Sequence, residues 1–529
     1  MNYSSPPAHD QFKGSLTLWT VAVALIFVAI MVRCVNLDEL PAFIHNDESA
    51  TAIYITPPFF SEPADSPMWG QNNYGGHANF GAWIASLYIR AFGGKTLWAI
   101  RMGSMVCGVL SIVFGALFLR SWMGLRSMLF FLVAVLPFHL HVHYSRTGFI
   151  YMQAAFFIAL VAYLFGRFVH RPSAMNGFIL GLSTGFALMV YSATHVLIGV
   201  LAVGLVVALM SPHARETFAK SRFSNSVGSF AAIVFGICCA IGQYVYYAYT
   251  IGHTSRFMQQ TVLRDEFREG VNREAGVSLT TVEIVWANFK RTIDFFYHGD
   301  GAMQYGPAES PLEVVGYSVF IFGILVLLYR SVKLDARAIF VVLLAISTII
   351  GASLMVEASF SPHFIAFALV IPFAGAVALE TACRIIRLRS ALLSALVAII
   401  VLVPWARWNY TVYADLDQRK RTLDTFIMHL PIPRESVKTI VNYTPLITDL
   451  SESFYMLRYP NAKGSRVETN AAFNVPKNVM DLSAANQCPC LVVVPKESYA
   501  AVIAALSGGK KQFREFSFDR LEAKMVYIE

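Results

Sequence analysis

Long apolar runs alternate with short polar segments along most of the chain. A helix that crosses a bilayer needs about 20 mostly apolar residues, and about eleven stretches of this sequence meet or approach that length. They are residues 17–35, 98–119, 127–143, 149–166, 176–191, 194–210, 228–249, 312–329, 338–357, 363–383 and 390–408. No small-residue cleavage motif follows the first run, so we expect a retained anchor and not a removed signal peptide. The pattern predicts an all-α polytopic membrane protein.

One apolar segment, from His77 to Gly94, does not fit this series. Its apolar stretch is about 15 residues long, which suits a helix lying at the membrane interface better than a span. Arg90 interrupts the stretch, and Gly93 and Gly94 close it. We therefore expect an interfacial helix here.

The basic residues test this assignment. If the segment is interfacial and the N-terminal tail (1–16) is cytoplasmic, every inner loop carries two or three Lys or Arg residues, as the positive-inside rule requires. These loops are 120–126, 167–171, 215–222, 330–337 and 384–389. The outer turns 191–195 and 360–363 carry none. We predict a multi-pass protein of the plasma (inner) membrane.

Three longer polar segments then lie on the extracytoplasmic (periplasmic) side of the membrane. They are a first outer loop (36–97), a second outer loop (250–311) and a C-terminal tail (409–529). In the tail, β-like runs at 436–443, 490–495 and 524–528 alternate with helical patterns at 415–429 and 496–506. We expect a transmembrane domain over 17–408, followed by a small extracytoplasmic α/β domain.

Composition agrees with this class. With 56% hydrophobic and 14% charged residues, the chain is too apolar for a soluble protein of its size. The net charge of +8 reflects membrane topology, and no basic surface with interleaved aromatic residues suggests a nucleic-acid partner. Five of the seven cysteines lie in or beside apolar runs, where free thiols are expected. In Cys488-Pro489-Cys490, an offset of two suits neither an easy disulfide nor a known zinc pattern.

Ionisable side chains gather on the outer side under this topology. They are Asp38, Glu39, Asp47, Glu48, His77, His139, His141, His143, Arg146, His195 and His363. Such groups are costly in a membrane unless they lie at a polar end or line a wet cavity. Acids that take a proton and cations that hold a phosphate suit a transfer reaction on a lipid-linked donor.

Four motifs follow one another along the first half of the chain: "LPAFIHNDESA", "AWIASLYIRAFGG", "LWAIRMGS" with Arg101, and "LPFHLHVHYSRTGF". Their order and spacing resemble GT-C-fold glycosyltransferases that use polyprenyl-phosphate sugars, relatives of protein O-mannosyltransferases and aminoarabinose transferases (glycosyltransferase family 39). The resemblance covers residues 17–210, with weaker echoes in "GFALMVYSATHVLIGVL" and "SPHFIAFALVIPF". It implies an integral-membrane enzyme of the cell envelope. This enzyme would transfer a sugar, with inversion, from a polyprenyl monophosphate to a protein, lipid or polysaccharide acceptor at the outer face.

Within the first motif, the resemblance and the local sequence both favour Asp47. It precedes a helix-competent stretch, so its carboxylate lies near a helix N-terminus, where it either caps the helix or does chemistry. In the catalytic interpretation, Asp47 accepts the proton of the acceptor hydroxyl, and Glu48 orients the acceptor or the cap. Asp38-Glu39 is interpreted as a solvated pair at the exit of the first span.

Arg146 and His77 are the expected ligands of the donor phosphate. A guanidinium can hold a phosphate with two parallel charge-assisted hydrogen bonds, although Arg146 could also be a helix-end arginine that reaches the headgroups. His143, Tyr191, His195 and His363 are expected to line the cavity. His139 and His143 share a helical face, but no third metal ligand is clear. A divalent metal is therefore possible but not supported by the sequence, and we assign no metal ligand and no other cofactor.

The main alternative is a transporter or flippase of a lipid-linked saccharide. Transporters place ionisable groups near the middle of the bilayer and often have repeated halves. Here these groups crowd one side, and no repeat is visible. A scaffold that binds partners through the C-terminal domain would leave the acidic loop unexplained.

Overall fold

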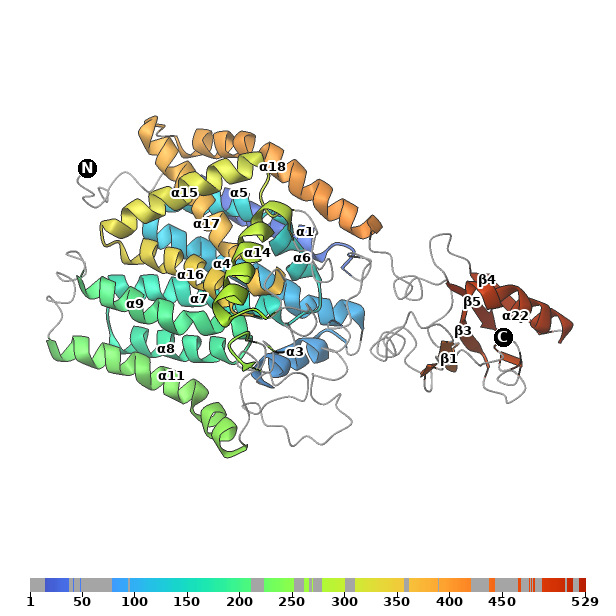
Figure 1. Ribbon diagram of the computed structural model, residues 1–529. Coiled ribbons are helices and arrows are strands. Elements are labelled where there is room, and N and C mark those ends of the chain that lie inside the picture. Colours follow the sequence, from blue (N-terminus) through green and yellow to red (C-terminus); the bar gives the residue numbers. More distant parts are fainter. Residues whose placement is uncertain are drawn as a thin grey trace.

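The structure is a computed structural model in which most of the helical body and part of the C-terminal region can be described. The described residues are 15–37, 41, 48, 79–93, 96–210, 223–251, 261–265, 269, 278–299, 310–355, 361–388, 390–419, 437–442, 465–467, 475, 477, 479–480, 488–509, 511–516 and 523–529. Within these ranges a bundle of helices is followed by a small sheet with one packed helix (Figure 1).

The bundle confirms the predicted polytopic helical fold. Among the described residues, nine helices are long and apolar enough to cross a membrane, or ten if the bent pair α5–α6 forms one span. The candidate spans are α1 (Ser15–Cys34), α4 (Leu97–Met123), α7 (Tyr151–His170), η2 with α9 (Ser192–His195 and Val196–Met210), α11 (Phe223–Ile251), α15 (Val314–Val332), α16 (Ala336–Ser353), α17 (Phe367–Ile385) and α18 (Ala391–Arg419). The run at 176–191 forms α8 (Ala174–Leu188), which is apolar but shorter.

Burial separates a central layer of helices from a peripheral one. In α17, 78% of the most apolar window is buried, against 17% in α1 and in α15, whose remaining apolar side chains point outward. The central helices pack closely because small residues face large ones: a Cβ on Gly115 of α4 would lie 2.6 Å from Cζ of Phe131. The Phe131 ring stacks on Phe373 of α17, with centroids 5.1 Å apart. Peripheral helices with exposed apolar faces are expected of a protein embedded in lipid.

The predicted span at 127–143 is not one straight helix. It divides into α5 (Leu125–Val135) and α6 (His139–Arg146), which meet at an angle of 69°. Pro137 lies in the break. Leu136 still makes the helical hydrogen bond from its N–H to the carbonyl of Leu132, but Pro137 has no backbone N–H to continue the series, so the helix ends there. Hydrophobicity alone could not locate this break, because the residues around Pro137 are apolar.

The ambiguous segment forms α3 (Asn79–Ala91), a 13-residue helix that packs on α4. Its length is well short of the roughly 20 residues of a span, which agrees with the interfacial assignment. The helix ends before Gly93, whose φ of 102° favours glycine.

Three of the predicted inner loops meet at one end of the bundle. Arg126 makes two hydrogen bonds of 2.7 and 2.8 Å to the Glu380 carboxylate, which also pairs with Arg384. Asp335 accepts hydrogen bonds from Arg330 and from the indole N–H of Trp122. The loops 120–126, 330–337 and 384–389 therefore lie at the same end of the helices, as the predicted topology requires.

The C-terminal region contains the predicted α/β unit. Its five-stranded sheet has the order β2 (Ser465–Val467), β1 (Thr439–Asn442), β3 (Cys490–Pro495), β5 (Ala523–Ile528), β4 (Phe513–Phe516). β2, β1 and β3 are parallel, while β5 and β4 are antiparallel to their neighbours. Val502 and Leu506 of α22 (Lys496–Gly508) share one apolar cluster with Val492 and Val526 of the sheet. The three predicted strands are present; β2 and β4 were missed because their short sequences, SRV and FREF, contain charged or polar residues and form no apolar run.

One expectation for this region needs correction. Cys488 and Cys490 are joined by a disulfide, because the chain bends and brings their Cα atoms to 4.3 Å. The sequence offset of two does not set that distance. Helix α18 continues to Arg419, and the domain boundary expected at residue 408 stays a prediction. The rest of the helical pattern at 415–429 lies outside the described residues.

The predicted orientation can be tested with two engineered cysteines at exposed positions, in a background where Cys238 and Cys239 are serine. Ser121→Cys lies at the basic end, and His298→Cys lies at the end of α14 (Thr281–His298), in the second outer loop. We expect a membrane-impermeant maleimide to label His298→Cys in intact cells and Ser121→Cys only after permeabilisation. The reverse pattern would overturn the orientation.

Candidate active site

The expected site residues fall into two groups. Asp47 and His77 lie outside the described residues, and so do Asp38 and Glu39. Glu48, Arg146, His143, Tyr191, His195 and His363 can be described. The geometry of the site is therefore built from Glu48 and from the helix ends around it.

Glu48 is completely buried and paired on both carboxylate oxygens. Nε of Arg101 donates to Oε1 at 2.6 Å, and Nη2 donates to Oε2 at 3.3 Å. The backbone N–H of Gly148 also donates to Oε1, at 2.7 Å. A carboxylate that is withdrawn from solvent and held by three donors anchors the first outer loop.

Arg101 extends this anchor to further segments. It is fully buried near the start of α4. Its Nη1 donates to the backbone carbonyls of Leu37 and Pro41, both at 3.0 Å. Arg101 thus ties the chain that leaves α1 and the first outer loop to α4. The sequence had marked Arg101 only as part of a motif, without predicting its partner.

Gly148 allows the close approach that this arrangement needs. A Cβ at this position would lie 2.3 Å from Cγ2 of Ile100 and 2.9 Å from Cγ of Glu48. Both distances are shorter than real Cβ contacts. Any side chain at residue 148 would therefore push Glu48 or α4 away and disturb the anchor.

Arg146, the expected phosphate ligand, contacts the end of α1 in this structure. Its guanidinium donates to the carbonyls of Val32 and Val35 at 2.7 Å and of Asn36 at 3.1 Å. The last carbonyls of a helix have no partner within the helix, and a cation there also favours the helix dipole. Arg146 therefore caps α1, only two residues away from the glycine that holds Glu48.

Two polar side chains from other helices form hydrogen bonds with backbone groups at the break between α5 and α6. On the α5 side, Arg33 of α1 donates to the carbonyl of Val135 at 3.1 Å. On the α6 side, Oδ1 of Asn409 of α18 accepts from the backbone N–H of His139 at 2.7 Å and from its ring Nδ1 at 2.6 Å. Backbone groups freed in a membrane need such partners. Arg33 and Asn409 were both missed, although a lone arginine near the end of an apolar run was a usable signal for Arg33.

The histidines of "HLHVH" face different neighbours. His139 bonds Asn409, whereas Nδ1 of His141 accepts from Arg33 Nη2 at 3.0 Å. Because an arginine cannot accept a hydrogen bond, the proton of His141 lies on Nε2, which is 2.9 Å from Oγ of Ser111. Among the residues that the structure describes, no three His, Cys, Asp or Glu side chains are close enough to share a metal ion.

Tyr191, His195 and His363 lie at the neighbouring loops of the same end. Aromatic rings connect the linker before α7 to η2: Phe149 contacts Tyr151 at 5.0 Å, and Tyr151 contacts Tyr191 at 4.7 Å. In η2, Nε2 of His195 donates to the carbonyl of Leu188 at 3.1 Å. η2 contacts η3 (Ser361–Phe364), which carries the half-buried His363. His143 of α6 is buried beside Tyr144.

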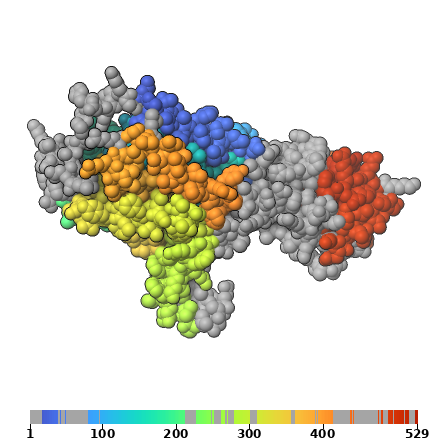
Figure 2. Space-filling view, turned by 90° about the horizontal axis from the view of Figure 1, so that it is seen from above, coloured from blue at the N-terminus to red at the C-terminus, as the bar shows by residue number. Residues whose placement is uncertain are grey.

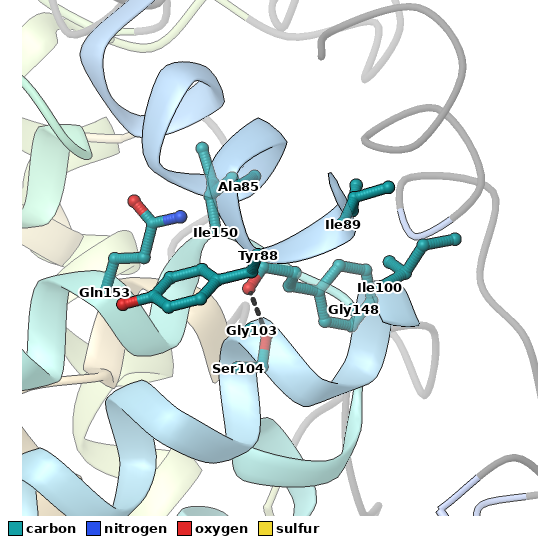
Figure 3. A pocket seen from close by; sticks show the side chains of 10 residues that line it. Ala85, Tyr88, Ile89, Ile100, Gly103, Ser104, Gly148, Ile150 and Gln153 are labelled. Atoms are coloured by element: carbon teal, nitrogen blue, oxygen red, sulfur yellow. Dashed lines mark hydrogen bonds between the residues drawn. The ribbon is translucent and has the colours of Figure 1, made fainter. Parts of the chain in front are cut away.

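A narrow cavity lies directly beside the Glu48 anchor, between α3, α4 and the linker 148–150 (Figure 3). Its volume is about 10 Å³, room for about one water molecule. Its polar lining includes Gln153, Tyr88 and Ser104, whose hydroxyl donates to the carbonyl of Phe149 at 2.8 Å. Burial raises the pKa of the Tyr88 phenol, so this group stays protonated at physiological pH.

The anchor can be tested with a double-mutant cycle. Because each single change leaves a buried charge unpaired, Glu48→Gln and Arg101→Met should each lower the free energy of unfolding by about 3–5 kcal/mol. The double variant should lose less than the sum, measured by denaturant unfolding in mixed micelles. Asp294→Asn, which breaks an exposed pair with His298, serves as a control with little effect. Additive losses would mean that the pair is not coupled.

Comparison with known proteins finds one family model and several solved structures that are similar to this chain. The sequence model of the dolichyl-phosphate-mannose-protein mannosyltransferase family matches residues 76–239. No curated protein matches the chain. Among solved structures, ArnT from Cupriavidus metallidurans bound to undecaprenyl phosphate is similar over 97% of each chain, with 13% identity and a TM-score of 0.48.

Two further structures are similar at comparably low identity, over smaller shares of their own chains. The archaeal oligosaccharyltransferase AglB from Archaeoglobus fulgidus, in complex with an inhibitory peptide and a dolichol-phosphate, is 13% identical (TM-score 0.48), over 94% of this chain and 71% of AglB. The arabinosyltransferase EmbB from Mycobacterium smegmatis has a TM-score of 0.40 over 79% of this chain and 40% of EmbB, with 12% identity. The resemblance recognised in the sequence over residues 17–210 is confirmed by the family match where the two overlap, over residues 76–210. This overlap includes Arg101 and Arg146 and begins after Glu48.

Proposed function

We propose that this protein is an integral-membrane glycosyltransferase that moves a sugar from a polyprenyl monophosphate to an acceptor at the outer face of the membrane. The observation that carries the proposal is the buried anchor of Glu48 on Arg101 and Gly148. It holds an acidic loop at the junction of α1, α4 and the linker before α7, within the helices that the mannosyltransferase family model matches in part. That family uses dolichyl-phosphate mannose, which favours a polyprenyl monophosphate as the donor carrier.

Asp47 is the general base in this proposal, and Glu48 is a positioning residue. Consecutive Cα atoms are about 3.8 Å apart, so anchoring Glu48 restricts where the carboxylate of Asp47 can reach. The acceptor oxygen attacks the anomeric carbon from the face opposite the phosphate, and its proton passes to Asp47. The bond between the anomeric carbon and the phosphate oxygen breaks, polyprenyl phosphate leaves, and the configuration inverts.

Two cationic groups are proposed for the leaving phosphate. His77 precedes α3 by two residues, and Arg146 lies at the end of α6. The contacts of Arg146 with α1 add a second role, since a guanidinium that caps α1 also sets the position of the chain that enters the first outer loop. His143, Tyr191, His195 and His363 are proposed to line the surrounding cavity.

The transporter alternative is less well supported. Among the described residues, the fully buried charged side chains Arg33, Arg101 and Glu48 lie at or beyond helix ends, on the side of the bundle opposite the basic loops. Each has protein partners that fix it in place. A transport pathway needs ionisable groups near the middle of the bilayer that exchange partners.

The role of Asp47 can be tested in a deletion strain. If the proposal is right, the strain accumulates a polyprenyl-phosphate sugar and loses one envelope modification, both visible by mass spectrometry. Asp47→Asn should fail to restore the modification, because loss of a general base slows transfer by about 10²–10⁴-fold. Asp38→Asn, in the other acidic dipeptide, is the matched control and should restore it. Full complementation by a folded Asp47→Asn protein would contradict the assignment.

The two roles of Arg146 predict different results for Arg146→Ala and Arg146→Lys. If Arg146 only binds the donor phosphate, donor binding weakens and the melting temperature of both variants is unchanged. If Arg146 caps α1, the melting temperature of Arg146→Ala falls, because three carbonyls lose their hydrogen-bond donor. We expect both effects in Arg146→Ala, measured by thermal unfolding and by binding of undecaprenyl phosphate. An unchanged Kd in a titration carried to saturating lipid would remove Arg146 from the donor site.

A further inference from the structure

Helix α14 is a well-defined helix in the second outer loop. A capping box starts it: Oγ1 of Thr280 accepts from the N–H of Glu283, and the Glu283 carboxylate accepts from the N–H of Thr280. These hydrogen bonds hold the pKa of Glu283 below its ordinary value, so the box is complete at neutral pH. The helix ends at Gly299, with a φ of 82°.

α14 packs at the end of the bundle opposite the basic loops. Nδ2 of Asn288 donates to the carbonyl of Met355, just after α16, at 2.8 Å. The Phe295 ring stacks on Phe364 of η3, with centroids 4.1 Å apart. In Figure 1, α14 runs across the direction of α16, and in Figure 2 the yellow-green segment that contains it projects from the body of the bundle.

The surface of α14 has three faces instead of the usual two. The buried face consists of Ile284, Asn288, Thr292, Phe295 and Phe296. The polar face consists of Glu283, Lys290, Arg291, Asp294 and His298. Between them runs an apolar stripe, which we call the α14 stripe: Val282, Trp286, Phe289, Ile293 and Tyr297, spaced four, three, four and four residues apart.

The described protein leaves the α14 stripe largely uncovered. Val282 is 77% exposed, Trp286 57% and Tyr297 62%, while Phe289 and Ile293 are half-buried. The stripe continues into the outward surface of a candidate span, because the Tyr297 ring stacks on Tyr317 of α15 at 5.5 Å. On that helix, Val314 is 74% exposed and Ile321 54%. One apolar surface therefore runs from a lipid-facing helix onto α14.

We propose that the α14 stripe inserts into the outer leaflet of the membrane, with α14 lying along the interface. Trp and Tyr favour this level of a bilayer, and amphipathic helices bind there with basic residues towards the headgroups. Lys290 and Arg291 supply such cations, and Nζ of Lys290 lies 5.5 Å from the ring centre of Trp286. The bilayer contact supports η3 from outside, because the opposite face of α14 holds Phe364.

Photo-crosslinking of the full-length protein in nanodiscs of phosphatidylethanolamine and phosphatidylglycerol tests this proposal. A benzophenone amino acid replaces Val282 or Trp286 in the stripe. The matched controls carry it at Ala287 or Asp294, which are exposed on the polar side of the same helix. After illumination, mass spectrometry of the intact protein counts phospholipid adducts. We expect the stripe positions to give several-fold more adducts than the controls.

Two outcomes would overturn the proposal. Equal phospholipid yields from both sides of α14, or none from either, would show that the stripe does not face the bilayer. Intramolecular cross-links from Val282 and Trp286 would show that another part of the chain covers it. The readout requires no sugar transfer, so its failure would leave the proposed glycosyltransferase function to its own test.

Discussion

The buried ion pair between Glu48 and Arg101 joins the segments from which the candidate site is built. Neither charge reaches solvent, so each needs the other as a partner. Nη1 of Arg101 also donates to the carbonyls of Leu37 and Pro41. The N–H of Gly148 completes the arrangement. The end of α1, the first outer loop, α4 and the linker before α7 are therefore held together at one point, beside the residue that we propose as the base.

The same requirement for paired polar groups explains the other arginines in the apolar helices. Arg33 bonds a carbonyl at the break between α5 and α6, and Arg146 bonds the last carbonyls of α1. Within a membrane these backbone groups have no water to replace a lost partner. Arginine suits this task because its planar group donates in several directions at once. Arg33 and Arg146 are thus first partners for backbone carbonyls, and a functional role must be compatible with that.

The two ends of the bundle differ in chemistry. At the basic end, Arg126, Arg384, Glu380, Arg330 and Asp335 pair with one another and close the helix ends together. At the other end, short helices and loops meet: α3, α6, η2, η3 and α14. Helix α6 and the linker after it run through this end because the break at Pro137 turns the chain away from the bundle axis.

Hydrophobic periodicity and length by themselves determined the membrane class, the helical runs, the α/β character of the tail and the interfacial length of α3, because each depends on local composition. Motif order determined the resemblance to polyprenyl-phosphate glycosyltransferases. Only the tertiary structure decided that Glu48 pairs with Arg101, that Arg146 caps α1 and that Asn409 completes α6, since these partners are far apart in the sequence. It also decided the disulfide between Cys488 and Cys490 and the angle at Pro137. The sequence shows which groups need hydrogen-bond partners, but the tertiary structure determines which residues these partners are. A buried charge or a freed carbonyl pairs with whichever group the packing of distant helices brings within hydrogen-bond distance.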